Sequence, residues 1–402
     1  KRGAIHRYTF PENAESGFII DLDYSLQRQT NSEMEIEVIS DTEICGHKKT
    51  TYWAFDQYIN FYAKFSKPFS YTLVTDSITM DNGKRLPVCK ALLHFNTSKD
   101  EQVLVKVGVS AVDIAGARKN VESEIPGWDF EKVRKDARTA WNEYLSKIDI
   151  TTSDKEDKAI FYTALYHTGI SPNLFTDADG RYLGMDLEVH QGDTLNPIYT
   201  VFSLWDTFRA AHPLYTLIHT HRIPDFVKSM MRQYDYYGYL PVWQLWGQDN
   251  YCMIGNHSIP VIVDAVLKGV AGVDEEKAYE AVFNSSIVSH PNSPFEVWEK
   301  YGYMPENIQT QSVSITLEQA FDDWCVAQLA KRLGKEKDYN HFMKRSAFYR
   351  NLFNSKTGFF QPKNDKGEWI EPFDPYKYGA NGGYPFTEGN AWQYFWYIPQ
   401  NI

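Results

Sequence analysis

The sequence predicts a multidomain β + α protein, with an antiparallel β-sandwich over residues 1–115, a linker helix region over 116–150 and an all-α domain over 151–402. Two observations predict this order. Apolar residues recur at every second position in the first part, the period of a strand, and at every third or fourth position after Gly116, the period of a helix. The 402 residues, 43% of them hydrophobic, suffice for two or three domains with buried cores.

Alternation marks the predicted strands. From Glu33 to Ile39, apolar residues alternate with glutamates, which places an apolar face on one side of a strand and carboxylates on the other. Residues 103–109 repeat this period with valine at each odd position. Shorter strand-like runs lie at 17–24, 69–75 and 90–95, with turn-prone segments such as Asp81-Asn82-Gly83 between runs. These segments together predict the sandwich.

The helical period begins after Gly116. Pro126-Gly127 breaks the chain, and residues 129–148 then carry one apolar stripe, which predicts a linker helix. Further stripes predict helices around 160–165, 317–329 and 339–353, with Gly334 placed to end the second of them. Little strand signal follows residue 150, so we expect the loops between helices to carry the function.

The charge balance argues against some partners. The formal net charge is -11, and no run of five or more Lys or Arg occurs, so neither a nucleic acid nor an anionic membrane surface is expected as the main partner. No apolar run reaches the roughly 18 residues of a membrane span. Aromatic residues make up 15% of the chain, which suits either a sugar site or simply a large aromatic core.

The most informative segment is 385–396, where Glu388 lies among glycine, amides and aromatic rings. Such a mixture is typical of a sugar site. A carboxyl group walled by rings loses water and is easier to keep protonated near neutral pH, as a general acid requires. Glu388 is therefore the candidate proton donor. The alternative is a satisfied glutamate in a buried loop whose rings only pack.

A second segment, 203–214, pairs charges with a ring. Asp206 and Arg209 are three positions apart and would meet on one face of a helix, beside Trp205. Two interpretations stay open. The residues form either a structural ion pair or a polar fork for sugar hydroxyls next to a stacking ring.

Two further segments carry polar groups. Residues 238–258 mix rings and amides without a regular period, and His257 within them is more often a hydrogen-bonded structural residue than a catalyst. Glu318, Asp322 and Asp323 lie on a predicted helix. Because carboxylates at four-residue spacing usually mark a solvated face, the sequence favours that interpretation for these three acids.

Other catalytic classes lack their signatures. The sequence contains no Gly-x-Ser-x-Gly elbow, Walker loop, Rossmann glycine fingerprint or His-Glu-x-x-His pair, and its four cysteines form no C-x-x-C metal pair. Carboxylate chemistry remains. Glycoside hydrolysis needs two acids, one to protonate the leaving oxygen and one to activate water or attack carbon.

Five segments follow one another in a distinctive order: Trp205-Asp206-Thr207-Phe208-Arg209, Leu240-Pro241-Val242-Trp243, Cys252-Met253-Ile254-Gly255-Asn256-His257, Val313-Ser314-Ile315-Thr316-Leu317-Glu318 and Thr387-Glu388-Gly389-Asn390-Ala391-Trp392-Gln393-Tyr394. This order resembles the calcium-dependent α-mannosidases of glycoside hydrolase family 92. The resemblance covers most of residues 116–402 and is weaker across the first 115.

The resemblance implies an amino-terminal β-sandwich joined by a helical linker to an (α/α)6 barrel. It also implies exo-acting hydrolysis of α-mannosides with inversion, with α-1,2 linkages as the expected preference. By position, Glu388 matches the family's general acid and Asp206 an aspartate that holds the terminal mannose. The remaining expected substrate-binding residues are Trp205, Arg209, Trp243, Asp249, His257, Asn390 and Gln393. The family usually shows Glu-Thr where this sequence has Asp249-Asn250.

Family members continue past the position of Ile402 into a motif that supplies the general base and into calcium ligands. The resemblance therefore implies calcium as cofactor, with its ligands beyond this chain, and a fragment of a longer enzyme in which sandwich and barrel are incomplete. We expect a secreted, periplasmic or cell-surface bacterial enzyme that acts on mannose-containing glycans. The alternatives are a non-catalytic glycan-binding protein that keeps the sugar pocket and an inverting glucosidase on the same barrel.

Overall fold

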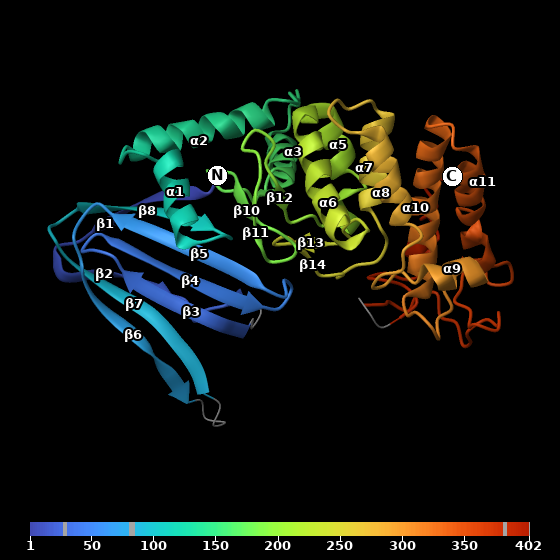
Figure 1. Ribbon diagram of the computed structural model, residues 1–402, viewed down its shortest axis with the longest axis horizontal. Coiled ribbons are helices and arrows are strands. Elements are labelled where there is room, and N and C mark those ends of the chain that lie inside the picture. Colours follow the sequence, from blue (N-terminus) through green and yellow to red (C-terminus); the bar gives the residue numbers. More distant parts are fainter. Residues whose placement is uncertain (27–29, 80–84, 381–383, 402) are drawn as a thin grey trace. The chain divides into compact units, whose positions relative to one another are not determined.

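The computed structural model describes residues 1–26, 30–79, 85–380 and 384–401 (Figure 1). The chain divides into two compact units, the first made of residues 1–201 with 245–248 and the second of 202–244 with 249–402. The first unit is rich in strands and the second is helical, which confirms the predicted β + α fold class. The predicted domain boundary near residue 150 falls within the first unit and stays a prediction.

The first unit is built on two antiparallel sheets, drawn in blue in Figure 1. One has the strand order β1-β8-β5-β4-β3 and the other the order β2-β7-β6. The strands are β1 (Gly3–Phe10), β2 (Asn13–Asp21), β3 (Thr30–Val38), β4 (Glu43–Thr51), β5 (Gln57–Phe65), β6 (Ser70–Thr79), β7 (Arg85–Thr97) and β8 (Glu101–Ser110). The strand segments predicted at 17–24, 33–39, 69–75, 90–95 and 103–109 all fall on these strands, whereas Asp81-Asn82-Gly83 lies outside the described residues.

One apolar core joins the two sheets. Leu93 and Phe95 of β7 belong to the same buried cluster as Ile44 of β4, Phe65 of β5 and Val103 of β8. Each of these strands places alternate side chains on the core face, as the period of two predicts. The β-sandwich inferred from the alternation is therefore confirmed.

Helix α1 (Ile114–Glu124) covers the other face of the five-stranded sheet. Ala117 and Val121 of this helix pack against Cys45 and Tyr62 of the sheet. Gly108 of β8 permits the close approach, because a Cβ atom at this position would lie 2.0 Å from the carbonyl oxygen of Ala117. Since α1 lies on β8, the strand is buried on both faces along part of its length.

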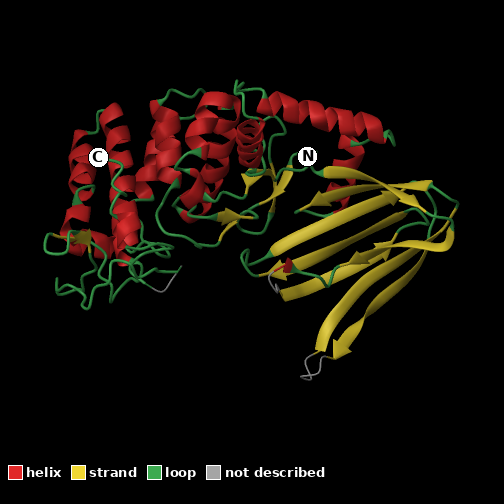
Figure 2. Ribbon diagram, turned by 180° about the vertical axis from the view of Figure 1, so that it is seen from behind, coloured by secondary structure: helices red, strands yellow, loops and turns green. Residues whose placement is uncertain are grey.

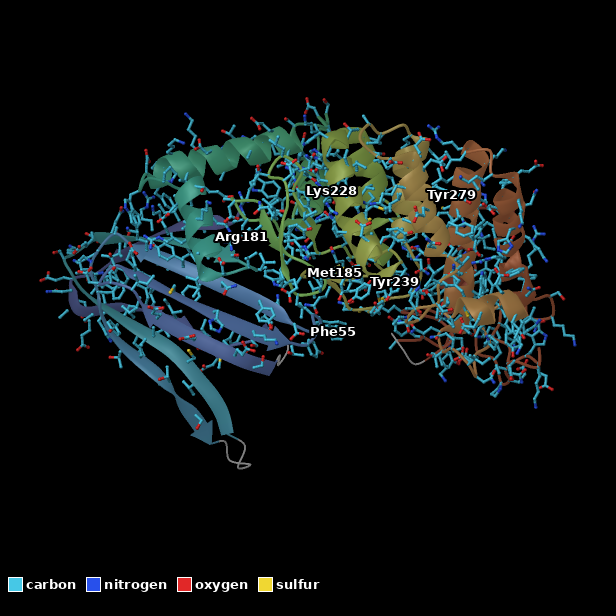
Figure 3. The ribbon with its side chains drawn as sticks, viewed as in Figure 1. Phe55, Arg181, Met185, Lys228, Tyr239 and Tyr279 are labelled. Carbon is cyan, nitrogen blue, oxygen red and sulfur yellow. The ribbon has the colours of Figure 1, made fainter. Side chains whose placement is uncertain are left out.

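Two longer helices and four short strands complete the first unit. Helices α2 (Phe130–Leu145) and α3 (Lys155–Thr168) lie where the sequence predicts helices at 129–148 and 160–165. The short strands are β9 (Asn173–Leu174), β10 (Arg181–Leu183), β11 (Val189–Gln191) and β12 (Tyr199–Thr200). Arg181, labelled in Figure 3, connects β10 to the start of α1 through an ion pair of 2.6 Å with Asp113.

The second unit consists of helices with long connections, drawn in red and green in Figure 2. Its elements are α4 (Leu204–Thr207), α5 (Ala211–Ile218), the 3₁₀ helix η2 (Thr220–Arg222), α6 (Ile223–Tyr237), α7 (Ser258–Leu267), α8 (Glu275–Asn284), α9 (Phe295–Tyr301), α10 (Ser312–Arg332), α11 (Glu336–Arg345), the 3₁₀ helix η3 (Phe348–Leu352), β15 (Phe353–Asn354), β16 (Phe359–Phe360) and α12 (Ala391–Tyr394). The short strands β13 (Gln244–Leu245) and β14 (Gln248–Asp249) lie where the chain passes between the units.

Helix α10 is the central element of this unit. It contacts α7, α8 and α11, and side chains on all of its sides are buried. As predicted from Gly334, the helix stops just before that residue, whose φ is 69°. The stripe at 339–353 gives a shorter helix than expected, because α11 ends at Arg345 and η3 follows. Within the described residues, none of the helices has both the length and the apolar character that crossing a membrane requires.

Candidate active site

A row of four charged side chains lies between the 203–209 segment and helix α10. Glu318 Oε1 accepts hydrogen bonds from Trp205 Nε1 at 3.0 Å and from Arg209 Nη2 at 3.1 Å. Glu318 Oε2 lies 2.8 Å from His257 Nε2, and His257 Nδ1 lies 3.0 Å from Asp322 Oδ1. We call Arg209, Glu318, His257 and Asp322 the charged row. Its members alternate in sign when the imidazole is protonated.

The charged row contradicts the solvated face expected for the α10 carboxylates. Glu318, Asp322 and Asp323 are all fully buried. Asp323 has a separate set of partners, Arg345 at 2.8 Å and the indole nitrogen of Trp298 at 2.8 Å. Helical spacing places carboxylates on one side of a helix, but cations brought by other segments decide whether that side can be buried.

Electrostatics fix the charge state of His257. Burial alone would lower the pKa of the imidazole, yet the carboxylates of Asp322 and Glu318 on either side of the ring raise it to about 9. Burial opposes ionisation of Glu318 as well, but His257 and Arg209 hold its pKa below the usual value. At neutral pH every charge in the row therefore has a neighbour of opposite sign, which offsets the cost of removing the charges from water.

The side chain of His257 is buried and packed against an aromatic ring. Its side chain is 1% exposed, and its ring stacks on Phe208 with centroids 4.0 Å apart and planes 14° apart. Gly255, two residues earlier, has a φ of 79°, and a Cβ atom there would lie 2.3 Å from His257 Nε2. The structure thus favours the hydrogen-bonded structural histidine over the expected substrate-binding role.

Arg209 is the exposed end of the charged row. Its side chain is 36% exposed, and its guanidinium carbon lies 4.8 Å from the ring centroid of Trp205, 4.7 Å from Phe208 and 4.9 Å from Tyr397. Three rings therefore surround a cation whose outer side faces solvent. Such an arrangement offers hydrogen-bond donors and apolar ring surface side by side.

The structural ion pair considered for Asp206 and Arg209 is wrong. Helix α4 ends at Thr207, so the two residues do not share a helix face, and Arg209 pairs with Glu318 instead. Asp206 is exposed and accepts a hydrogen bond from the hydroxyl group of Ser203. Its carboxylate thus remains accessible to a ligand.

The backbone before Glu388 is anchored to the start of α10. Thr387 is fully buried, with its N–H donating to Ser314 Oγ at 2.9 Å and its hydroxyl to Gln311 Oε1 at 2.6 Å. The Tyr394 hydroxyl donates to the Thr387 carbonyl at 2.7 Å. Burial and the nearby charge of Glu318 raise the pKa of Tyr394.

Glu388 itself is exposed, which overturns the expectation that rings wall its carboxyl group. Phe386 and Tyr394 turn into the helical core instead, and Trp392 and Trp396 are themselves exposed. The backbone of Glu388 has a φ of 45°, in the left-handed region that costs a non-glycine residue about 1 kcal/mol or more. The anchors at Thr387 hold this conformation, so a strained backbone presents an accessible acid.

Asn390 and Gln393 start helix α12. Asn390 Oδ1 accepts from Gln393 N at 3.2 Å, and Gln393 Oε1 accepts from Asn390 N at 3.0 Å, which is a reciprocal capping box. The cap uses the acceptor oxygen of each side chain. The amide NH₂ group of Gln393, which is exposed, is left as a donor for a ligand.

Asp249 organises the loop at 238–258. It is buried, and its carboxylate accepts from the backbone N–H groups of Val242 at 2.7 Å, Trp243 at 3.1 Å and Tyr251 at 2.9 Å, and from Gln233 Nε2 at 2.8 Å. Four donors fill the acceptor positions of a carboxylate. The geometry favours a role in holding the backbone of Trp243, which is half-buried, over a direct contact with a sugar.

The expected site residues thus fall into two groups. Trp205 and Arg209 meet on Glu318, whereas Asp206 and Glu388 make no hydrogen bond or ion pair with the charged row in the part of the chain that the structure describes. Sequence reasoning missed Glu318 as their partner. The sequence signal was an acid close to Val313, Ile315, Leu317 and Ala320, because an acid that is buried with apolar neighbours is stable only when it is paired.

Metal-ligating side chains do not gather anywhere in the described part of the chain. Among residues 1–26, 30–79, 85–380 and 384–401, no three or more His, Cys, Asp or Glu side chains cluster so that they could hold a metal ion. Calcium also accepts carbonyl and water oxygens as ligands. Calcium and its ligands therefore stay a prediction of the family resemblance.

Comparison with known sequences decides the family. A sequence model described as the glycosyl hydrolase family 92 catalytic domain matches residues 116–402, and one described as the N-terminal domain of this family matches residues 1–110. The chain belongs to glycosyl hydrolase family 92. The resemblance inferred from the five ordered segments is confirmed, including its weaker amino-terminal part.

Solved structures of family GH92 resemble this chain closely. A GH92 α-mannosidase from Bacteroides thetaiotaomicron has a TM-score of 0.92 and 35% identity, and the match covers 99% of this chain and 54% of that chain. A GH92 inverting mannosidase from the same bacterium has a TM-score of 0.87 and 29% identity, with the same coverage of 99% and 54%. This chain therefore spans about half the length of these relatives.

A fungal relative supports the same family. The protein named "Uncharacterized secreted glycosidase" from Arthroderma benhamiae is 30% identical over 328 residues, which are 73% of this chain and 38% of that protein. This GH92 chain thus corresponds to less than half of the fungal protein.

Proposed function

We propose that the full-length protein is an exo-acting, inverting α-mannosidase that releases mannose from mannose-containing glycans, with a preference for α-1,2 linkages. One observation carries the proposal: separate family segments meet on helix α10, where Glu318 holds Trp205 and Arg209 and where the first turn anchors Thr387 beside Glu388. The solved relatives support the substrate class, since they are described as α-mannosidases and one of them as inverting.

Glu388 takes the role of general acid in this proposal. Its carboxyl group is exposed on a backbone fixed by Thr387, so it can reach the oxygen of a leaving group and donate a proton to it. An inverting reaction also needs a base that activates water on the opposite face of the sugar. We assign no base among the described residues.

The terminal mannose would bind to the wall around Arg209. The Arg209 guanidinium can donate charge-assisted hydrogen bonds, and the Trp205 ring can stack on an apolar face of the sugar. Asp206 would accept from sugar hydroxyls and Gln393 would donate to them, because both side chains are exposed. Trp243 would complete the wall, with Asp249 holding its backbone.

Two further parts of the proposal rest on family resemblance. Calcium is proposed as the cofactor of the full-length enzyme. A secreted, periplasmic or cell-surface location in a bacterium is proposed because the fungal relative is named a secreted glycosidase and two solved relatives come from a bacterium.

The substitution Glu388→Gln tests the acid. It keeps the shape of the side chain and removes its proton, so hydrolysis of an alkyl α-mannoside by the full-length protein should fall roughly 10²- to 10⁴-fold. An aryl mannoside with a good leaving group should lose much less activity, since its departure needs little protonation. Initial rates of mannose release from the two substrates measure the difference.

The matched control is Glu368→Gln, at an exposed glutamate of the same unit that accepts a hydrogen bond from Asn364. This variant should hydrolyse both substrates at the wild-type rate. Equal losses on the alkyl and aryl substrates in Glu388→Gln would remove Glu388 from the acid role.

A further inference from the structure

Two acids on helix α10 hold the same kinds of partner in different places. Asp323 binds the guanidinium of Arg345 and the indole nitrogen of Trp298, and both of these partners are fully buried. Glu318 also binds one guanidinium and one indole nitrogen, those of Arg209 and Trp205, but these side chains reach the surface. The first acid therefore stabilises a core, whereas the second controls groups that a ligand can touch.

We infer that Glu318, His257 and Asp322 are positioning residues, which hold Trp205 and Arg209 in the orientation that receives the sugar without touching the sugar themselves. The inference rests on the proposed function, because Trp205 and Arg209 are the wall residues of that proposal. Each of the three positioning side chains is at most 1% exposed, so none of them is within reach of a ligand at the surface.

The two carboxylate oxygens of Glu318 have different partners. Oε1 accepts from both wall residues, at 3.0 Å from Trp205 Nε1 and 3.1 Å from Arg209 Nη2, and Oε2 faces His257 at 2.8 Å. A carboxylate held on one side by a cation cannot rotate freely, so the direction of Oε1 is set from inside the protein. The orientation of an exposed arginine thus depends on a buried histidine.

His257 can hold the Glu318 carboxylate in this direction only as an imidazolium. Both of its ring nitrogens lie within ion-pair distance of a carboxylate, Nε2 at 2.8 Å from Glu318 and Nδ1 at 3.0 Å from Asp322. The contact with Glu318 is electrostatic, since the two atoms make no hydrogen bond, and only the imidazolium presents a positive charge to both carboxylates. Phe208 stacks on one face of the ring, and the ion pairs of the ring within the described residues are those with the two carboxylates. The charged groups that face the ring are therefore the two carboxylates, with Arg209 beyond Glu318. The Tyr397 hydroxyl is also near Glu318, and the pKa of Tyr397 is raised by burial and by that charge.

The test compares Glu318→Gln with Asp323→Asn in the full-length protein. Side-chain ¹⁵Nε–H NMR of Arg209 reports whether its guanidinium is held, and calorimetry with mannoimidazole, the ligand of a solved GH92 complex, reports sugar-site affinity. Glu318→Gln should make the Arg209 signal mobile and weaken mannoimidazole roughly 10- to 100-fold, the range for loss of charge-assisted hydrogen bonds. Asp323→Asn removes an equally buried charge, so it should lower thermal stability yet leave both readouts at wild-type values.

The inference is overturned if Arg209 stays as ordered in Glu318→Gln as in Asp323→Asn. Should Glu318→Gln fail to fold, the ring ¹⁵N shifts of His257 in the wild-type protein decide: an imidazolium at pH 7 supports the row, and a neutral ring overturns it. The proposed function fails separately. If the wild-type protein binds no mannoimidazole although its Arg209 signal is ordered, the proposed sugar site is wrong, and the positioning of Arg209 by Glu318 still holds.

Discussion

At the residue scale, three carboxylates of the helical unit lie in three different environments. Glu318 is buried between two cations, Asp249 is buried among four N–H donors, and Glu388 stands exposed on a left-handed backbone. His257 and Arg209 hold the pKa of Glu318 below its usual value, and the four N–H donors fix the orientation of the Asp249 carboxyl group, which suits positioning. Glu388, the exposed one of the three, is accessible to a ligand, and this accessibility is the structural basis for its proposed role.

His257 makes stability depend on pH. Its pKa is about 9 in the folded protein against 6.5 for an unperturbed histidine, so the folded state binds its proton more tightly than the unfolded state. The resulting stabilisation is fully present below pH 6.5 and is lost as the pH rises through 9. The difference between the two values corresponds to about 3 kcal/mol.

We therefore expect the free energy of unfolding of the 402-residue chain, measured with denaturant from pH 6 to pH 10, to fall across this window. The variant His257→Gln should be less stable than the wild-type protein at pH 6. Between pH 6 and pH 10 its free energy of unfolding should fall by about 3 kcal/mol less than that of the wild-type protein. An unchanged slope in His257→Gln would show that the imidazole does not carry the charge of the row.

At the scale of elements, the close approach of the Gly255 turn to His257 connects the 252–257 segment to α10. The turn needs both a φ of 79° and the absence of a side chain, because a Cβ atom would lie 2.3 Å from His257 Nε2. His257 in turn contacts Glu318 and Asp322 one helical turn apart on α10. A change at Gly255 should therefore disturb the charged row.

Alanine substitutions at Gly255 and at a second glycine, Gly358, separate the cost of the left-handed backbone from the cost of the clash with His257. Gly358 has a similar φ of 77°, but a Cβ atom there would meet nothing within 4 Å. Gly358→Ala should cost only the left-handed strain, about 1 kcal/mol, whereas Gly255→Ala should cost at least about 2 kcal/mol more through the clash with His257. Chemical denaturation of both variants measures this; equal losses would mean that the imidazole is not held against the turn.

Elements with a strong local period were predictable from the sequence. The alternating residues of β3 and β8 and the stop of α10 at Gly334 follow from backbone preferences that act over a few residues. The surroundings of Glu318 were not predictable, because its partner Arg209 is 109 positions away along the chain. The prediction that rings wall the Glu388 carboxyl group was wrong for a related reason. The sequence shows that aromatic residues lie near Glu388 along the chain, but whether their rings face the core or the carboxyl group depends on packing.

At the scale of the whole molecule, this GH92 chain combines a β-sandwich with a helical unit that carries Glu388 and the proposed mannose-binding residues. The sandwich and the helices are each predictable from periodicity, and the family from the order of five segments. The chemistry of the site needed the structure, because it arises where three of those segments meet on α10. The central claim is that these segments together form an inverting α-mannosidase site.

The configuration of the released mannose tests that claim most directly. The full-length protein would be mixed with an alkyl α-mannoside, and ¹H NMR would follow the anomeric signals before the free sugar equilibrates. Inversion through acid catalysis by Glu388 predicts β-mannose as the first product. Release of α-mannose first, or no release of mannose by a folded full-length protein, would contradict the account.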